Sequence, residues 1–258
     1  RYKLNGENLQ VMLSTRELSS EKLPDEAQTW TNRHLVYTHG HGVAMSAVNT
    51  VNPNGQPHMF LQDVPTTPTE GFEELEMDEA GVYYGLKSLP FIIVGSKVRE
   101  LDYQGEGAAP VFTDYTGPGG VALNSFIKRI AYAWQFVDIN IFISRQIDTD
   151  TSRIQYRRTI PERFDALTPF LVPDKDPYQV VSDGRIFFIQ DGYTTTSKYP
   201  YSTPSDTGEF NYIRNSVKAV VDAYDGTVDY YVFEPNDPII QTYSKMFPTL
   251  FKDKNQMK

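Results

Sequence analysis

Hydrophobic and polar positions divide the chain into a strand-rich start, a helical middle and a strand-rich end. Residues 7–16 read as an early strand, and the polar segment 17–29 reads as a loop or short helix. Two short runs rich in strand-forming residues follow at 35–39 and 42–48. The glycines around residue 41 favour a tight turn between these two predicted strands.

The next part of the chain shows little periodicity. Residues 49–80 hold four prolines and end in an acidic run. Because proline disrupts both helix interiors and central strands, this segment is predicted to be a long surface loop. Short strands are predicted after it at 83–85 and 91–96. The glycine-rich segment 104–120 predicts either a hinge between two halves or a loop that lets backbone approach a ligand.

The clearest helix is predicted over 122–136. Apolar residues recur there at the spacing of one helical face, and we expect that stripe to pack on a sheet. Its members are Leu123, Phe126, Ile127, Ile130, Ala131, Trp134 and Phe136. Further helices are predicted at 138–147, with Asp138 as N-cap, and at 160–171, with Pro161 in the first turn.

The last third of the chain is patterned for antiparallel strands. One hairpin is predicted over 179–196, around a Ser-Asp-Gly turn, and a second over 217–234. Asp225-Gly226 is the favoured two-residue turn for such a hairpin. Asp237-Pro238 then opens a final helix. The whole pattern predicts an α+β fold, with a mixed or antiparallel sheet and at least three helices packed on it.

Composition narrows the class of protein. The 258 residues suffice for a single soluble domain over 1–258, although the chain also reads as a fragment of a larger ectodomain. The net charge of -9 argues against nucleic acid as a partner and against direct contact with an anionic bilayer. The absence of cysteine removes thiol chemistry and disulfides. No run of 18 apolar residues is present to span a bilayer.

Three of the four histidines lie within eight residues: His34, His39 and His41. His39 and His41 would share one face of a strand, because strand side chains alternate with period two. Such a pair can hold a transition metal, with His34, His58 or Asp63 as a third ligand. The alternative is that these histidines form hydrogen bonds within a turn-rich edge. The sequence indicates no cofactor beyond this metal.

Other catalytic signatures are absent or incomplete. Asp148, Asp150 and Ser152 resemble the opening of a calcium loop, but Arg153 and Thr159 stand where that motif needs glycine and glutamate. The chain holds no phosphate-binding loop of the Walker type and no esterase-type serine elbow. Aspartates are frequent near aromatic residues, yet sequence does not measure the separation that a glycosidase requires. The sequence therefore assigns no catalytic residues, which are unknown at this point.

A polar and aromatic cluster near residue 195 predicts a recognition surface. Tyr193, Lys198, Tyr199 and Tyr201 lie within nine residues, interleaved with threonines. Tyrosine is amphipathic and loses little entropy when ordered, so such loops are typical of ligand-binding surfaces. The alternative is an ordinary exposed loop.

Four long segments resemble a known family. They are NRHLVYTHGHGVAMSAVN (32–49), GGVALNSFIKRIAYAW (119–134), DPYQVVSDGRIFFIQDGYTTTSKYPYS (176–202) and NYIRNSVKAVVDAYDGTVDYYVFEPNDPIIQTY (211–243). In this order they resemble uncharacterised protein family 0182, a group of bacterial multi-pass membrane proteins. The resemblance implies several membrane spans followed by a large soluble region outside the cytoplasm, of which this chain would be part. It implies no activity and no catalytic residues.

Three functional hypotheses follow. The first is an extracytoplasmic binding or interaction module of a membrane protein in the bacterial cell membrane. Its partners would be the missing membrane-spanning part of the same protein and an envelope component or another protein. The second is a cell-envelope hydrolase that uses the histidine cluster or a carboxylate pair. The third is a purely structural ectodomain, which would expose an apolar patch where the missing parts dock.

Overall fold

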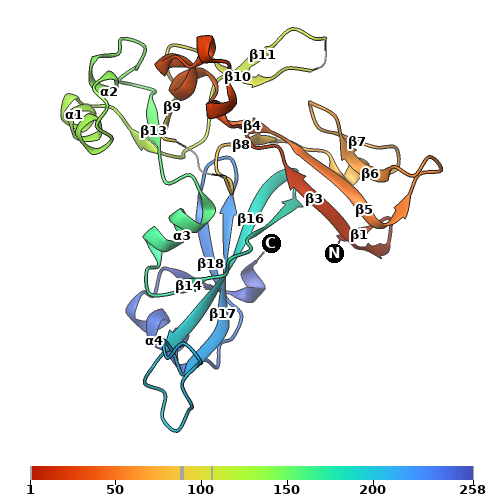
Figure 1. The fold of residues 1–258 in the computed structure, drawn as a ribbon, viewed down its shortest axis with the longest axis vertical. Coiled ribbons are helices and arrows are strands. Elements are labelled where there is room, and N and C mark those ends of the chain that lie inside the picture. The colour runs from red at the N-terminus through yellow and green to blue at the C-terminus, as the bar shows by residue number, and fades with distance from the viewer. Residues whose placement is uncertain (1, 88–89, 106, 258) are drawn as a thin grey trace.

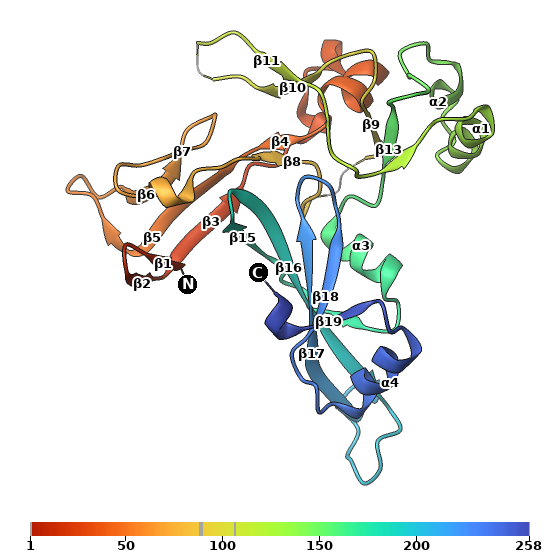
Figure 2. The same ribbon diagram turned by 180° about the vertical axis from the view of Figure 1, so that it is seen from behind.

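A computed structural model describes residues 2–87, 90–105 and 107–257 of the chain. Figures 1 and 2 show three arms that meet near the middle of the molecule. One arm is the N-terminal sheet, the second holds α1 and α2, and the third is the long C-terminal sheet.

The N-terminal arm is a four-stranded antiparallel sheet in the order β3-β5-β6-β7. A small antiparallel pair, β1 and β2, precedes it along the chain. The bounds of these strands are β1 Tyr2–Leu4, β2 Glu7–Leu9, β3 Val11–Thr15, β5 Val43–Val51, β6 Pro57–Gln62 and β7 Thr67–Pro68.

The middle arm combines short strand pairs with two helices. One sheet has the order β12-β13-β9, and two further antiparallel pairs are β10-β11 and β4-β8. The strand bounds are β4 Gly40–His41, β8 Gly81–Val82, β9 Ile92–Val94, β10 Glu100–Tyr103, β11 Val111–Thr113, β12 Val121–Ala122 and β13 Arg153–Gln155. Helix α1 spans Phe126–Gln135, helix α2 spans Asn140–Ile143, and a single π-helical turn spans Asn32–Val36.

The C-terminal arm is a six-stranded sheet in the order β14-β16-β17-β18-β19, with β15 also paired to β16. Its strands are β14 Val172–Pro173, β15 Tyr178–Ser182, β16 Arg185–Thr196, β17 Tyr212–Asp222, β18 Val228–Val232 and β19 Phe251–Asp253. All pairs are antiparallel except β18 with β19. Helices α3 (Ile160–Leu167) and α4 (Pro238–Met246) belong to the same arm. Four short 3-10 turns lie at Ser20–Lys22, Asp25–Ala27, Glu73–Leu75 and Lys254–Gln256.

Three clusters of buried hydrophobic residues form the cores of the arms. The largest joins the N-terminal sheet to the upper end of the C-terminal sheet, through side chains such as Met45, Phe60, Tyr84 and Phe188. The second fills the middle arm, and the third lies where Phe164 and Ile240 from α3 and α4 meet the C-terminal strands. The predicted α+β class, with mixed and antiparallel sheets and at least three helices, is confirmed.

Several local predictions hold. The strands at 7–16 and 42–48, the hairpin at 179–196 and the helix at 160–171 all have counterparts in the structure. The final helix begins as predicted, because the Asp237 side chain accepts a hydrogen bond from the Ile239 amide and proline follows the cap.

Other local predictions are wrong. Residues 35–39 do not form a strand, because the chain first makes the π-helical turn and becomes extended only at Gly40. The segment 49–80 is not a long loop, since β6, β7 and a 3-10 turn lie within it. Pro57 and Pro68 are tolerated there because each lies at the end of a strand, where a missing amide donor costs little.

The hairpin at 217–234 exists, but its turn is longer than predicted. Strand β17 ends at Asp222 and β18 begins at Val228, so five residues connect them rather than Asp225-Gly226 alone. Gly226 has a φ of +71° there, and a Cβ on it would lie 2.4 Å from the ring of Tyr84. Both the backbone conformation and this close approach require glycine.

The glycine-rich segment 104–120 contains strand β11, and its residue 106 lies outside the described residues. Its last part is held by Arg153, whose guanidinium donates to the carbonyls of Pro118, Gly119 and Gly120. The hinge therefore stays a prediction for residues before 118.

The prediction for helix α1 is wrong about which side of the helix is buried. Tyr132, Ala133 and Phe136 pack against the second cluster, whereas most of the predicted core stripe faces solvent. Ile127 is 78% exposed and Trp134 is 86% exposed. In the described part of the chain, no helix combines the length and apolar character needed to cross a membrane.

Candidate functional site

Two histidines and two carboxylates converge where the three arms meet. His39 and His41 stand two residues apart on the extended segment that forms β4, and Glu100 and Asp102 stand two residues apart on β10. Because extended chains alternate their side chains, each pair points to one side. His41 Nδ1 lies 2.8 Å and His39 Nε2 lies 3.4 Å from the same atom, Asp102 Oδ1.

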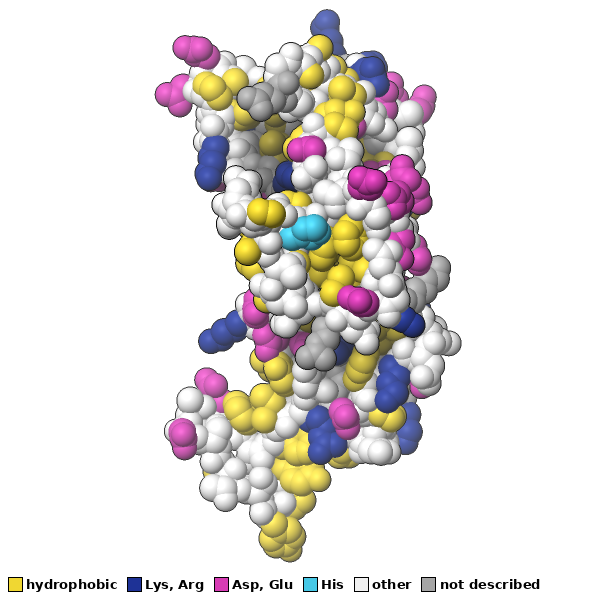
Figure 3. Space-filling view, turned by 90° about the vertical axis from the view of Figure 1, so that its right-hand side faces the viewer, with side chains coloured by type: hydrophobic (Ala, Val, Ile, Leu, Met, Phe, Trp, Pro, Cys, Tyr) yellow, Lys and Arg dark blue, Asp and Glu magenta, His cyan; other side chains and the backbone are white. Residues whose placement is uncertain are grey.

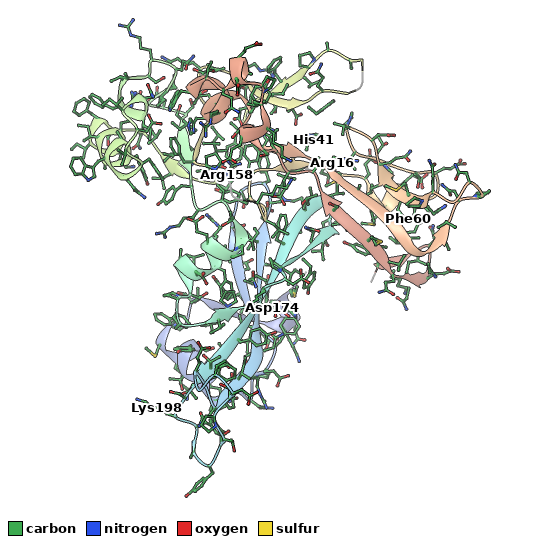
Figure 4. The ribbon with its side chains drawn as sticks, viewed as in Figure 1. Arg16, His41, Phe60, Arg158, Asp174 and Lys198 are labelled. Carbon is green, nitrogen blue, oxygen red and sulfur yellow. The ribbon has the colours of Figure 1, made fainter. Side chains whose placement is uncertain are left out.

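Gly40, between the two histidines, allows this segment to pack closely against the residues that follow β3. A Cβ there would lie 1.9 Å from the carbonyl oxygen of Arg16. The backbone of the His-Gly-His segment therefore lies directly against the chain that leaves β3, and a side chain would push both histidines away. Figure 4 shows His41 near Arg16 and Arg158 in this region.

A buried network of hydrogen bonds fixes the position of His39. Thr38 Oγ1 donates to Glu100 Oε2 at 2.5 Å, and the Tyr83 hydroxyl donates to the same oxygen at 2.9 Å. Since the Thr38 proton goes to Glu100, Thr38 Oγ1 accepts from His39 Nδ1, which lies 2.8 Å away. The imidazole of His39 stacks on the Tyr83 ring at 4.3 Å between centroids. His39 thus donates from both nitrogens, as an imidazolium does.

The pKa values agree with that assignment. Burial opposes a charge on His39, but its contacts with Asp102 and Glu100 outweigh burial and raise the pKa of the imidazole. Burial alone would raise the pKa of Asp102, yet its contacts with both histidines hold that pKa well below its usual range. Burial, followed by the neighbouring Glu100 charge, raises the pKa of the Tyr83 hydroxyl well above its ordinary value.

This cluster opens into a pocket of about 330 Å³, which we call the acidic pocket. Its carboxylates are Asp78, Glu79 and Asp102, and the rings of Tyr83 and Tyr224 form part of its wall. No lysine or arginine is found among the described residues that line it. The remaining lining residues are His39, His41, Pro65, Thr66, Met77, Ala80 and Thr113.

The pKa of Glu79 is shifted in the opposite direction to that of Asp102. Burial raises its pKa, although the Gly81 amide donates a 3.0 Å hydrogen bond to it and Arg185 lies near. A second opening of about 240 Å³, lined by Arg16, Glu17, Tyr37 and others, also reaches His41 and Asp102. His41 is therefore accessible from two directions.

The histidine–carboxylate cluster predicts a definite dependence of stability on pH. Since folding raises the His39 pKa above its ordinary value of 6.5, its contribution is complete below about pH 6.5 and is lost as pH rises through the folded pKa. Since folding lowers the Asp102 pKa below 3.8, its contribution is present above about pH 4. The urea midpoint of the protein minus that of His39→Gln should therefore be largest near pH 5–6 and shrink toward pH 9.

His34 offers a control of opposite sign for that measurement. Burial lowers its pKa, although the Phe91 carbonyl accepts from its ring. The same difference measured with His34→Gln should fall as pH drops below 6.5 and should stay constant above that pH. A difference for His39→Gln that does not change between pH 5 and 9 would contradict the assignment of His39 as an imidazolium.

The three predicted metal ligands do not come together. His34 stacks on Phe91 at 4.2 Å, and its Nδ1 lies 2.7 Å from the Phe91 carbonyl, in the second hydrophobic cluster. Across the described ranges, no three His, Cys, Asp or Glu side chains are arranged to hold a metal ion. The structure thus brings together His39 and His41 but separates both from His34.

The predicted tyrosine cluster lies elsewhere. Tyr193 donates from its hydroxyl to Asp174 at 2.7 Å, Tyr199 stacks on Tyr212 at 4.6 Å, and Tyr201 is fully exposed. Figure 4 shows Lys198 near the lower end of the molecule, far from His41. Tyr193 belongs to β16, the other three lie in the loop between β16 and β17, and none of the four lines the acidic pocket.

Sequence reasoning missed most of this site. Glu79, Tyr83, Glu100 and Asp102 carry no recognised motif, and Asp102 lies 61 residues from His41. One signal was available: Glu-x-Asp at 100–102 repeats the two-residue spacing of His-x-His at 39–41. Two matching alternations of opposite charge favour contact between the two segments, although their strands pair elsewhere, β4 with β8 and β10 with β11.

Comparison with known proteins identifies relatives. The model of the uncharacterised protein family UPF0182 matches residues 1–258. The chain is 44% identical over 256 residues to a UPF0182 protein of Synechococcus sp. (strain JA-2-3B'a(2-13)), covering 98% of this chain and 30% of the relative. It is 45% identical to UPF0182 proteins of Methanospirillum hungatei JF-1 over 257 residues and of Moorella thermoacetica over 258 residues. These matches cover 98% and 100% of this chain and 28% of each relative.

The chain therefore spans less than a third of the length of these relatives. No solved structure matches it. The family resemblance seen in the four sequence segments is confirmed over the full length, and the chain belongs to the uncharacterised protein family UPF0182.

Proposed function

We propose that this chain is a ligand-binding module of a larger protein, and that its ligand is a small organic cation held in the acidic pocket. The observation that carries this proposal is the lining itself. Asp78, Glu79 and Asp102 line one pocket, and no lysine or arginine is present among the described lining residues. A cationic ligand would supply the missing positive charge.

The charges within the pocket favour an ammonium or guanidinium group. Asp102 is already paired with the two histidines, whereas Asp78 and Glu79 form no direct ion pair among the described residues, although Arg185 lies near Glu79. A partly enclosed site strengthens such an attraction, because the surrounding protein screens charge less than water does. The volume of about 330 Å³ lies at the lower end of the range for small-molecule sites.

The setting of the module is part of the same proposal. We place it outside the cytoplasm, attached to the membrane-spanning part of its parent protein in a bacterial cell membrane. Two points support this setting: the membership of a family for which we expect several membrane spans, and relatives that are more than three times as long as the chain. The net charge of -9, with acidic side chains gathered on part of the face drawn in Figure 3, would also attract cationic solutes.

The test is calorimetric titration of the protein with ethylamine, putrescine and choline, with acetate as an anionic comparison. We expect at least one amine to bind, and Glu79→Gln to weaken it by about tenfold, as expected for loss of one partly desolvated charge contact. Glutamine can still accept from the Gly81 amide, so the local fold should persist.

Glu76→Gln is the matched control for this titration. Glu76 belongs to the same acidic run and makes the same change in net charge, but it is exposed and does not line the pocket. Equal weakening by both variants, or no binding by any of the three amines, would reject the cation-binding proposal.

The rival function is a cell-envelope hydrolase, and one observation favours it. The 2.8 Å contact with Asp102 orients the His41 ring through Nδ1, which leaves Nε2 available as a general base. Turnover of chromogenic ester or glycoside substrates that falls at least about 100-fold in His41→Gln would support catalysis. Amine binding without any turnover would support the binding module instead.

A further inference from the structure

Helices α1 and α2 present a contiguous set of exposed apolar side chains, which we call the α1–α2 face. Val137, in the turn between the helices, is 92% exposed. The members of the face are Phe126, Ile127, Ile130, Trp134, Val137, Ile139 and Ile143. Isolated exposed hydrophobic residues are ordinary, but a cluster of this size on two adjacent helices indicates a binding surface.

The exposure does not come from a loosely attached helix. The Arg129 guanidinium donates to the carbonyls of Ile141, Phe142 and Ser144, and so fixes α1 to α2. The Asp138 carboxylate accepts from the Trp30 indole at 2.7 Å and from the Asn140 amide at 2.9 Å. Both helices are thus anchored to the middle arm with the apolar face pointing outward.

The backbone of the turn between α1 and α2 is strained. Val137 has a φ of +53°, which is rare for a β-branched residue. A strained residue of this kind persists where the surrounding structure holds it, and such residues gather at functional sites. Here the strained turn places the valine side chain at the tip, beside the groove formed by Trp134, Ile130, Ile139 and Phe142.

The local charge differs from that of the whole chain. Between residues 122 and 147 there are three basic residues, Lys128, Arg129 and Arg145, and one acidic residue, Asp138, which makes a local charge of +2 against -9 overall. Since Arg129 is bound to the carbonyls of α2, the basic groups left to meet phosphate groups above an apolar layer are Lys128 and Arg145, which lie next to Ile127 and close to Ile143 in the chain. The overall charge therefore argues against a bilayer contact for the other arms, but not for this one.

We propose that the α1–α2 face docks on the surface of a phospholipid bilayer, with Trp134 and Val137 entering the interfacial layer. Ten residues of helix extend about 15 Å, which is too short to span a bilayer but suits a helix lying in its plane. Tryptophan prefers this interface because its ring is apolar and its indole N–H is polar. Figures 1 and 2 show α1 and α2 at an outer end of the molecule, where a flat surface can reach them.

The test is cosedimentation of the 258-residue chain with vesicles of phosphatidylcholine, with and without one quarter phosphatidylglycerol. We expect binding to both, tighter to the anionic vesicles. Ile127→Ser and Trp134→Ser should each weaken binding by about tenfold, because each removes one large side chain from the buried apolar area. Reversing the charge of Lys128 with Lys128→Glu should reduce only the preference for phosphatidylglycerol.

Ile213→Ser is the matched control, because Ile213 is 48% exposed on β17 of the C-terminal sheet, outside the face. Light scattering of the same samples tests whether a second copy covers the face. Absence of vesicle binding, equal loss of binding in Ile213→Ser, or a dimer that Trp134→Ser dissociates would each overturn the proposal. This test does not depend on the acidic pocket, so amine binding can fail while vesicle binding succeeds.

Discussion

Replacing Arg158 with methionine is expected to destabilise the protein by about 3–5 kcal/mol, the range for breaking a buried charged network. Arg158 is 2% exposed, and its guanidinium donates to the carbonyls of Tyr83, Pro90 and Thr38 at 2.7, 3.0 and 2.5 Å. Burial lowers its pKa to about 10, so it stays charged at neutral pH. Methionine would fill much of the space but would remove the donor from three carbonyls, of which those of Tyr83 and Thr38 are buried.

Arg157→Met is the matched control for this prediction, because Arg157 is the exposed neighbour and loses the same charge. Urea unfolding followed by circular dichroism should place the midpoint of Arg158→Met far below that of the unchanged protein and of Arg157→Met. Similar midpoints for the two variants would mean that the three carbonyls find other donors and that the network contributes little.

Loss of the Arg158 side chain should also affect the histidine–carboxylate cluster beside the acidic pocket. Thr38 and Tyr83, whose carbonyls Arg158 holds, also donate from their hydroxyl groups to Glu100 beside His39. Arg158 is thus a positioning residue for the histidine–carboxylate cluster, and it lies outside the pocket lining. In a folded Arg158→Met sample, we therefore expect the pH dependence assigned to His39 to weaken together with stability.

Replacing Asp237 with alanine is expected to cost about 2–4 kcal/mol, the sum of a lost helix cap and of buried hydroxyls left without an acceptor. The Asp237 side chain is buried at the start of α4. It accepts from Thr194 and Ser216 at 2.5 Å each, from Tyr212 at 2.8 Å and from the Ile239 amide at 3.0 Å. Burial opposes its charge, but these hydrogen bonds outweigh burial and lower its pKa.

Two comparisons separate the parts of this effect. Asp237→Asn should lose less than Asp237→Ala, because asparagine still caps the helix but offers one acceptor oxygen instead of two. Asp206→Ala removes an exposed aspartate in the β16–β17 loop and should change the urea midpoint little. If Asp237→Ala unfolds at the same midpoint as Asp206→Ala, then neither the cap nor the hydroxyl contacts stabilise the C-terminal arm.

The features predicted well from sequence are those encoded by neighbouring residues. Asp237-Pro238 predicts the start of α4 because the cap and the first helical turn are adjacent in the chain. Asp225-Gly226 predicts a hairpin for the same local reason, although the turn has five residues, whose amides at Tyr224, Asp225 and Gly226 donate to Asp222. The contact of Gly226 with Tyr84 is tertiary and has no local sequence signal.

Helix α1 shows the limit of periodicity. The spacing of Phe126, Ile130 and Trp134 predicts a helix with one apolar side, and both features are present. The pattern does not say which side meets the rest of the molecule. Tyr132 and Phe136 were packed inward because Phe91 and Tyr156 lie on that side, which leaves the more apolar stripe exposed.

For the candidate site, the order of residues along the chain determined that His39 and His41 point to one side, since alternation in an extended segment is a local property. It also determined the α+β class and the family to which the chain belongs. The partners Asp102, Glu79 and Arg158 were decided by the packing of three arms around one point. Contacts between residues 60 to 120 positions apart depend on the packing of the whole core, so no short sequence pattern predicts them.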